Sequence, residues 1–322
     1  MKIRAALVLG CLLGLIWFSG FARAAGEGEF RITLLGTGSP IPLPNRFGPA
    51  TLVEAGNQKL LFDAGRGVTI RLWQQRIPYR AVDILFLTHF HSDHVSGIPD
   101  LWLTGWLGGP FGRRASPFRV IGPVGTKELM SNLERAYAAD IRIRIADENY
   151  PPDGIKVLAT EFHAEGVVHD ESGVKVTAFV VNHGDKIKPA YGYRVDYDGR
   201  SAVISGDTRF DENLIRHSMG VDVLVHEVAA ARPELMANPQ IQRVMAHHTT
   251  PQELGTVFRR TRPKLGVYTH LVMVARIGVP PITVDELIAQ TRETYDGPLQ
   301  VGEDLMSFEI AKDRVVVHRP SR

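Results

Sequence analysis

The sequence has a single cysteine, Cys11, among 322 residues. It lies in the apolar segment at the N-terminus, so the remainder of the chain contains no thiol. This excludes an intramolecular disulfide and a zinc site built from thiolates. The chain must be stabilised by its hydrophobic core alone, which about 300 residues can provide within one domain.

An excess of charge of either sign is also missing. The chain has 37 Lys and Arg against 35 Asp and Glu, for a formal charge of +2. Three of the basic residues and none of the acidic ones fall in residues 1–24, so the remainder has 34 basic and 35 acidic residues and a formal charge of −1. A near-neutral domain offers no global attraction for nucleic acid, and we therefore expect no nucleic-acid partner.

A long apolar run stands at the N-terminus, at residues 5–18. Two basic residues precede it, and the small-x-small sequence ARA follows at 22–24. This order is typical of a secretory signal peptide cleaved after Ala24, although an uncleaved anchor is the alternative. We expect a leader at 1–24, a single domain at 25–322 without a stable membrane span, and a periplasmic or secreted location.

A histidine-rich motif follows the apolar run 82–87, which is rich in β-formers and predicts a buried strand. In an extended loop, side chains at i and i+2 point the same way, so His89 and His91 can bind one ion together. Asp93 and His94 fall where the chain turns into a helix and can serve a second ion. This donor set suits zinc or another divalent transition metal. The alternative is a polar loop that merely contains histidines.

Three further polar residues come directly after predicted apolar strands. Strands at 174–181, 201–205 and 265–268 are followed by His183, Asp207 and His270. Because the ends of neighbouring strands meet at one edge of a sheet, we expect these side chains to complete one site. A lone histidine at a strand end is often structural, but three such positions together with the histidine-rich motif favour metal ligation.

The rest of the pattern alternates strands, loops and helices without an internal repeat. Further strands are predicted at 30–36, 51–55, 59–62, 118–121 and 155–159, and helices at 98–106 and 127–139. Many short strands of this kind predict an α/β (α+β) fold with two sheets flanked by helices. Trp102, Trp106 and Phe111 either wall an aromatic pocket or pack in the core. We expect surface or loop positions for the isolated histidines His163, His169, His217 and His318.

The motif His89-x-His91-x-Asp93-His94 after a hydrophobic strand resembles the metallo-β-lactamase superfamily of metallohydrolases. The sequences LGTGSP at 35–40, PAYGYR at 189–194, SGDT at 205–208 and AHHTTP at 246–251 are similar to the branch that contains ribonuclease Z and the zinc arylsulfatases. The resemblance covers nearly all of the chain after the leader. It implies an αββα sandwich with the site along one edge.

The same resemblance implies two Zn²⁺ ions as cofactors, with another divalent transition metal as the alternative. The implied ligands are His89, His91 and His183 for the first ion, Asp93, His94 and His270 for the second, and Asp207 as the bridge between them. A hydroxide held between the ions would attack the substrate, and Asp93 would also be available as a proton acceptor. Two zinc ions, two aspartates and a hydroxide leave one net positive charge, which favours an anionic ester.

Three more residues have roles by resemblance. A histidine matching His248 assists the leaving group, and a glutamate matching Glu227 orients that histidine; a structural polar pair is the alternative. An aspartate matching Asp63 holds the histidine loop, whereas a helix cap is its ordinary role. We expect the adjacent His247 to be a bystander.

The ribonuclease branch usually adds a flexible basic arm that binds transfer RNA. Here the segment 122–126 leads directly into a predicted helix, and the following IRIRIADENYPPDG is short and acidic. We therefore expect an exported, arylsulfatase-like di-zinc hydrolase of a small sulfate or phosphate ester. The alternatives are a ribonuclease Z-type tRNA 3′-processing endoribonuclease, a phosphodiesterase, a lactonase, and a metal-binding module without catalysis. The oligomeric state is not indicated.

Overall fold

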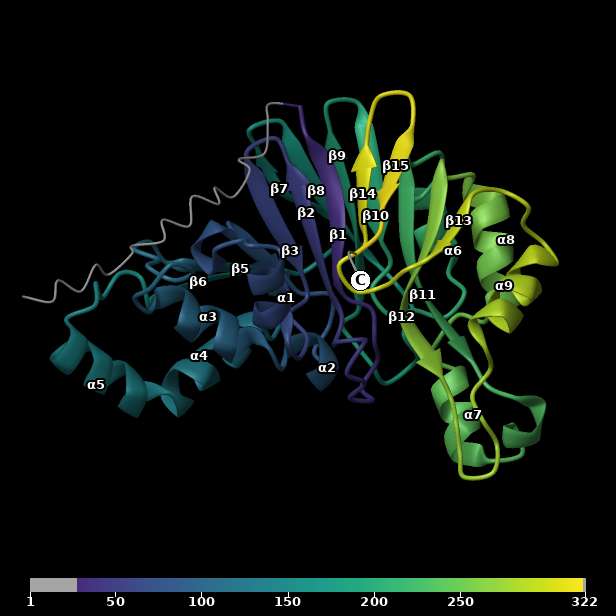
Figure 1. The fold of residues 1–322 in the computed structure, drawn as a ribbon, viewed down its shortest axis with the longest axis horizontal. Helices are drawn as coiled ribbons and strands as arrows, with labels where there is room; N and C mark the ends of the chain where they lie inside the picture. The colour runs from purple at the N-terminus through teal and green to yellow at the C-terminus, as the bar shows by residue number, and fades with distance from the viewer. Residues whose placement is uncertain (1–27, 321–322) are drawn as a thin grey trace, which may run out of the picture.

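The computed structural model describes residues 28–320, in which two β-sheets face one another and carry helices on their outer sides (Figure 1). This layered arrangement confirms the predicted αββα sandwich. The predicted leader at 1–24 lies outside the described residues, and cleavage after Ala24 stays a prediction. Across residues 28–320, none of the helices combines the length and the apolar character that a membrane crossing needs.

One sheet has eight strands in the order β15-β14-β1-β2-β3-β4-β5-β6. Their bounds are β1 Phe30–Gly36, β2 Ala50–Ala55, β3 Gln58–Phe62, β4 Ile84–Phe86, β5 Phe118–Pro123, β6 Val157–Phe162, β14 Ser307–Ile310 and β15 Val315–His318. The strands β3 to β6 run parallel, so their carboxyl ends share one edge of this sheet.

The second sheet has seven strands in the order β13-β12-β11-β10-β9-β8-β7. Their bounds are β7 Gly166–Glu171, β8 Val174–Val180, β9 Tyr191–Tyr197, β10 Arg200–Ile204, β11 Val223–Ala230, β12 Leu265–Met273 and β13 Leu299–Val301. Because β10, β11 and β12 are parallel neighbours, residues that follow or end these strands gather on one side of the sheet.

The main core lies between the sheets and is built from alternate residues of the strands. Phe62 and Phe86 stack with ring centroids 5.0 Å apart, and Tyr193 of the opposite sheet packs on both. The Tyr193 hydroxyl donates to the backbone oxygen of Leu87, the residue just before the histidine loop. The core therefore fixes where the end of β4 delivers that loop.

Helices cover the two outer faces. Their bounds are α1 Val68–Gln74, α2 Ser92–Val95, α3 Ile98–Trp106, α4 Thr126–Ala136, α5 Ala138–Glu148, α6 Glu212–His217, α7 Pro239–Met245, α8 Pro251–Thr261 and α9 Val284–Arg292. The helices α1, α3 and α4 pack on the eight-stranded sheet, and α6, α8 and α9 on the other. The helix α8 begins with a capping box between Thr250 and Glu253, which fixes the chain just after His248.

Several local predictions need correction. The helix predicted at 127–139 is two helices, α4 and α5, and α5 has no buried residue. Of the two alternatives for Trp102 and Trp106, the structure supports core packing, because α3 buries both rings against the eight-stranded sheet. His169 is buried and its Nε2 lies 2.8 Å from Gln58 Oε1, so it links the two sheets and is not a surface histidine.

Candidate metal centre

The segment from Thr88 to His94, which we call the histidine loop, begins just after β4 ends. Its first residue is hydrogen-bonded to Asp63. Thr88 donates to Asp63 twice, from its backbone N–H at 2.9 Å and from its hydroxyl at 2.8 Å. His91 is the N-cap of the short helix α2, so Asp93 and His94 lie in its first turn. The change from extended loop to helix separates the two pairs of side chains, as the spacing predicted.

The first group of donors consists of His89, His91, His183 and Asp207, whose ligand atoms all lie within 4.8 Å of one another. His91 Nδ1 lies 3.0 Å from His89 Nε2 and 3.2 Å from His183 Nε2. His183 Nδ1 donates to the His247 backbone oxygen at 2.9 Å, which leaves its Nε2 with a free lone pair facing the group.

The second group consists of Asp93, His94 and His270. His270 is the extra residue of a β-bulge in β12 opposite β11, and its backbone φ is +43°. A bulge re-aims a side chain, and here it brings His270 Nε2 to 3.3 Å from Asp93 Oδ2. The next residue, Leu271, donates its backbone N–H to the Thr37 backbone oxygen at 3.0 Å. This hydrogen bond helps to keep His270 in its strained backbone conformation.

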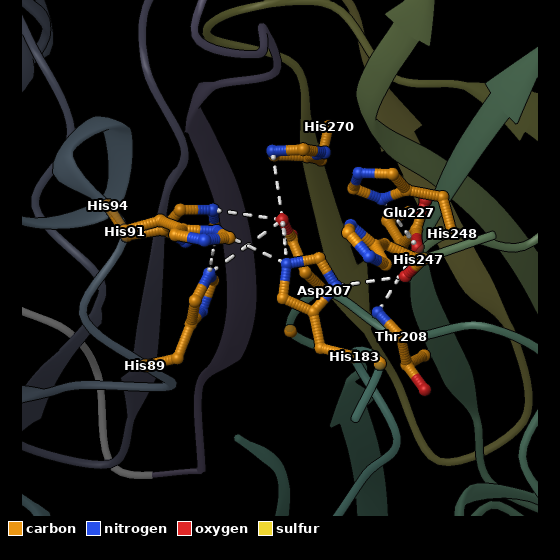
Figure 2. A network of polar contacts seen from close by, with 12 residues as sticks. His89, His91, His94, His183, Asp207, Thr208, Glu227, His247, His248 and His270 are labelled. Carbon is orange, nitrogen blue, oxygen red and sulfur yellow. Dashed lines mark hydrogen bonds and ion pairs between the residues drawn. The ribbon is translucent and has the colours of Figure 1, made fainter. Parts of the chain in front are cut away.

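Asp207 belongs to the first group and also contacts the second, and in Figure 2 the dashed lines from the surrounding histidines meet at its carboxylate. Its Oδ2 atom is 3.3 Å from His270 Nε2, 3.4 Å from His94 Nε2 and 3.6 Å from His183 Nε2. A single carboxylate oxygen so close to imidazoles of both groups has the position of a bridging ligand. The side chains predicted from strand ends and from the histidine loop are therefore brought to one place.

Two properties of the donors fit divalent metal. Among the described residues, the buried atoms His94 Nε2 and Asp207 Oδ1 have no hydrogen-bond partner, although burial without a partner is costly for such atoms. Burial also lowers the pKa of His183 to about 4 and holds the pKa of His89 well below its usual value. Neutral imidazoles with unshared lone pairs are the form that binds metal.

Glu227 and His248 form a second polar unit beside the metal ligands. Glu227 is fully buried in the middle of β11, and its Oε1 accepts from His248 Nδ1 at 3.0 Å. The same oxygen accepts from the backbone N–H groups of Thr208 and Thr249, at 3.1 and 3.2 Å. Burial alone would lower the pKa of His248, but the charge and hydrogen bond of Glu227 raise it to about 9.

The donors open into a cavity of about 340 Å³. One wall is polar and includes His91, Asp93, His183, Asp207, His247, His248 and His270. The remaining lining is largely apolar and includes Ile41, Val244 and residues 272–275. His247 lies at the cavity, and its backbone oxygen accepts from His183 Nδ1. That the His247 side chain is a bystander stays a prediction.

Sequence reasoning missed the threonines of the site. Thr88, Thr208 and Thr249 donate to Asp63 or Glu227, and the Thr249 hydroxyl also donates to the Thr208 backbone oxygen at 2.7 Å. Each stands beside a predicted ligand or catalytic residue, in THFH, SGDT or HHTTP. Adjacency to a ligand was the signal available for them.

The fold and this site together define a class of protein. Residues 58–271 match the family model described as the Beta-lactamase superfamily domain, so the chain belongs to the metallo-β-lactamase superfamily of metal-dependent hydrolases. Its fold is similar to a metallo-β-lactamase fold protein from Bacillus subtilis, with a TM-score of 0.68, 18% identity, and 87% of this chain and 99% of that chain covered.

Within the superfamily, the chain belongs to the ribonuclease Z family. It is 36% identical to ribonuclease Z of Mycobacterium marinum and 35% identical to that of Mycobacterium avium, each over 285 residues that cover 87% of this chain and 98% of the relative. The human short form of tRNase Z shares the fold, with a TM-score of 0.63, 23% identity, and 86% of this chain and 98% of that chain covered.

These relatives overturn three predictions. The exported arylsulfatase-like function is wrong, because the matched relatives are ribonucleases Z over almost their full length. The expectation of no nucleic-acid partner fails with it, because net charge does not report how charge is distributed around a site. The periplasmic or secreted location, which was predicted from the N-terminal apolar run, is also wrong, because the relatives that this chain matches over 98% of their length are ribonucleases Z.

Proposed function

We propose that this protein is a ribonuclease Z-type endoribonuclease that hydrolyses a phosphodiester bond of transfer-RNA precursors at their 3′ side. The observation that carries the proposal is the 36% identity to a ribonuclease Z along 98% of that relative, and the cluster of metal-binding side chains in this structure supports it. A domain that extends from residue 25 to 322 would contain the whole activity.

We further propose two divalent ions, with zinc as the metal, at the two donor groups joined by Asp207. His89, His91 and His183 would hold one ion, and Asp93, His94 and His270 the other. Imidazole and carboxylate donors without thiolates suit zinc. When bound, such a pair of ions supplies an activated water and neutralises charge on the phosphodiester.

Residues of this chain would carry out the proton transfers. Glu227 fixes the orientation of His248 through Nδ1, so His248 Nε2 is left for the substrate in the cavity. With its pKa raised to about 9, His248 is protonated at neutral pH and can donate a proton to the leaving ribose oxygen. Asp93 contacts His270, which also contacts Asp207, so the Asp93 carboxylate lies at the site where it can accept a proton from the water.

The test is cleavage of a precursor transfer RNA with an unpaired 3′ trailer by zinc-loaded protein, followed on a denaturing gel. We expect a single cut at the start of the trailer. Asp207→Ala, purified in the same way, is the control for a contaminating nuclease. Intact precursor after incubation with fully zinc-loaded wild type would overturn the proposal.

A further inference from the structure

A second hollow adjoins the metal-centre cavity. It has a volume of about 750 Å³ and lies between α7 and the end of β12. Its lining residues are Gln240, Ile241, Val244, Val274, Ala275, Arg276 and Ile277, and we call it the α7 groove. Figure 1 shows α7 beside the loop that leaves β12, away from the main body of the sandwich.

The α7 groove is continuous with the metal centre. Val244, Val274 and Ala275 line both the groove and the cavity that contains the ligands. The strand β12 also carries His270, only four residues before Val274. A substrate whose scissile bond lies at the metal ligands would therefore extend directly into this groove.

The outer rim of the groove is a well-defined turn. Arg276 and Val279 exchange two backbone hydrogen bonds, at 3.1 and 2.9 Å, and Gly278 takes a φ of +82° between them. Val274 N–H donates to the oxygen of Ala230 at 2.9 Å, which ties the start of this segment to β11. The turn holds Ile277 fully in solvent, with a relative exposure of 106%.

The chemistry of the lining matches unpaired nucleotides. Five of the seven lining residues are aliphatic, and the two polar ones are Arg276 and Gln240, with Arg276 Nη2 donating to Gln240 Oε1 at 3.1 Å. None of the residues that line the groove is acidic, so nothing in the lining repels phosphate. Flat bases pack on apolar and guanidinium surfaces, and Arg and Gln match the hydrogen-bonding edges of bases.

We propose that the α7 groove is a subsite for the unpaired RNA nucleotides adjoining the scissile phosphate, with Arg276 and Ile277 as its contact residues. The proposal rests on the ribonuclease Z-type function above, because it assigns one part of that substrate to one part of the surface. The shared lining of groove and cavity is the reason for choosing RNA as the occupant over a second protein.

The test compares two substrates on zinc-loaded, full-length protein. A precursor transfer RNA with an unpaired trailer fills the groove, whereas bis(p-nitrophenyl) phosphate reaches the metal centre alone. We expect Ile277→Asp and Arg276→Ala each to lower kcat/KM for the precursor by about 5- to 150-fold, the range given by loss of one stacked base. The loss should be mainly in KM, and hydrolysis of the small diester should be unchanged.

Met219→Asp is the matched control. Met219 is also an exposed apolar residue, with 55% relative exposure, but it precedes β11 at the end of the strand opposite the metal centre. The same loss in this control, an equal loss on both substrates, or no loss on the precursor would overturn the subsite. A dimer that dissociates in Ile277→Asp, measured by light scattering, would identify a second copy as the occupant and also overturn it.

Failure of the subsite can be separated from failure of the function. If wild type hydrolyses the small diester but leaves the precursor intact, the proposed function fails. Binding of a fluorescent single-stranded oligoribonucleotide, followed by anisotropy, then tests the groove alone. Weaker binding by Ile277→Asp with unchanged binding by Met219→Asp supports the subsite, and equal binding by all three proteins overturns it.

Discussion

His94 Nδ1 lies 2.7 Å from Asp63 Oδ2, and both side chains are buried. The bond directs His94 Nε2 toward Asp207 and Asp93, at 3.4 and 3.7 Å. Because the same carboxylate binds Thr88 at the start of the histidine loop, one buried acid sets both the loop and the tautomer of its last histidine.

Replacing Asp63 should therefore weaken metal binding without removing a ligand. We expect Asp63→Asn to lower zinc affinity by about 10- to 100-fold, the usual cost of losing a carboxylate behind a ligating histidine. Asn is chosen because Asp63 has a φ of +59°, a conformation that Asn tolerates. Titration against a chromophoric chelator measures the affinity, and an unchanged affinity would show that Asp63 supports the loop alone.

Metal content tests the pairing of the donors. Wild-type protein reconstituted with zinc should contain two equivalents per chain by elemental analysis. His183→Ala should lose one of them, whereas Asp207→Ala should lose both, because Asp207 Oδ2 lies beside imidazoles of the two groups. One equivalent or none in the wild type would contradict the dinuclear proposal.

His248 should be separable from metal binding, because it contacts Glu227 and is outside the proposed ligand set. His248→Ala should retain its zinc and lose about 10²- to 10⁴-fold in kcat. The loss should shrink as the leaving group becomes more acidic, since a good leaving group needs no proton. Phosphodiesters of phenols of graded acidity measure this; a uniform loss at every acidity would point to positioning of the substrate.

His226 should make folding stability depend on pH. Burial lowers its pKa to about 4 from an ordinary value of 6.5, while its Nδ1 donates to the backbone oxygen of Glu227 at 2.7 Å. Between pH 6.5 and pH 4, His226 is protonated in the unfolded chain but neutral in the folded chain. Its contribution to the free energy of unfolding is therefore fully present above pH 6.5 and is lost as the pH falls toward 4. The change between pH 7 and pH 5 should be about 2 kcal/mol.

Urea unfolding of metal-free protein at the two pH values checks this. His226→Asn retains an amide donor for the backbone oxygen of Glu227 but does not titrate. Between pH 7 and pH 5 this variant should therefore lose about 2 kcal/mol less stability than the wild type. Equal losses in the two proteins would assign the pH dependence to other groups.

Much of the fold followed from local patterns. Apolar runs ended by polar residues predicted β1, β4, β5, β8 and β10 to within a few residues, and the strand-end positions of His183 and Asp207 with them. Such features are readable because the strand and its final residue are adjacent in sequence. The bulge at His270 was not predicted, because it depends on the register between β11 and β12.

The rest depended on contacts between distant residues. Asp304 accepts from the backbone N–H and hydroxyl of Thr37, 267 positions away, and also binds Arg71 at 2.8 Å. This network fixes the start of the loop in which Ile41 lines the cavity. No sequence spacing connects Thr37, Arg71 and Asp304, so the network could not be predicted. The prediction of a small ester in place of RNA as the substrate was wrong for a related reason. Net charge contains no information about which residues surround a site.

The donors come from both halves of the sandwich. His89, His91, Asp93 and His94 follow β4 of the eight-stranded sheet, whereas His183 and Asp207 follow strands β8 and β10 of the seven-stranded sheet, and His270 lies in its strand β12. Metal ions bound by these seven residues would join the two sheets. The free energy of metal binding would then add to the free energy of unfolding. Each tenfold rise in free metal above the dissociation constant of one site adds about 1.4 kcal/mol. The supply of metal in the cell would then control how long the folded protein survives, as well as whether it is active.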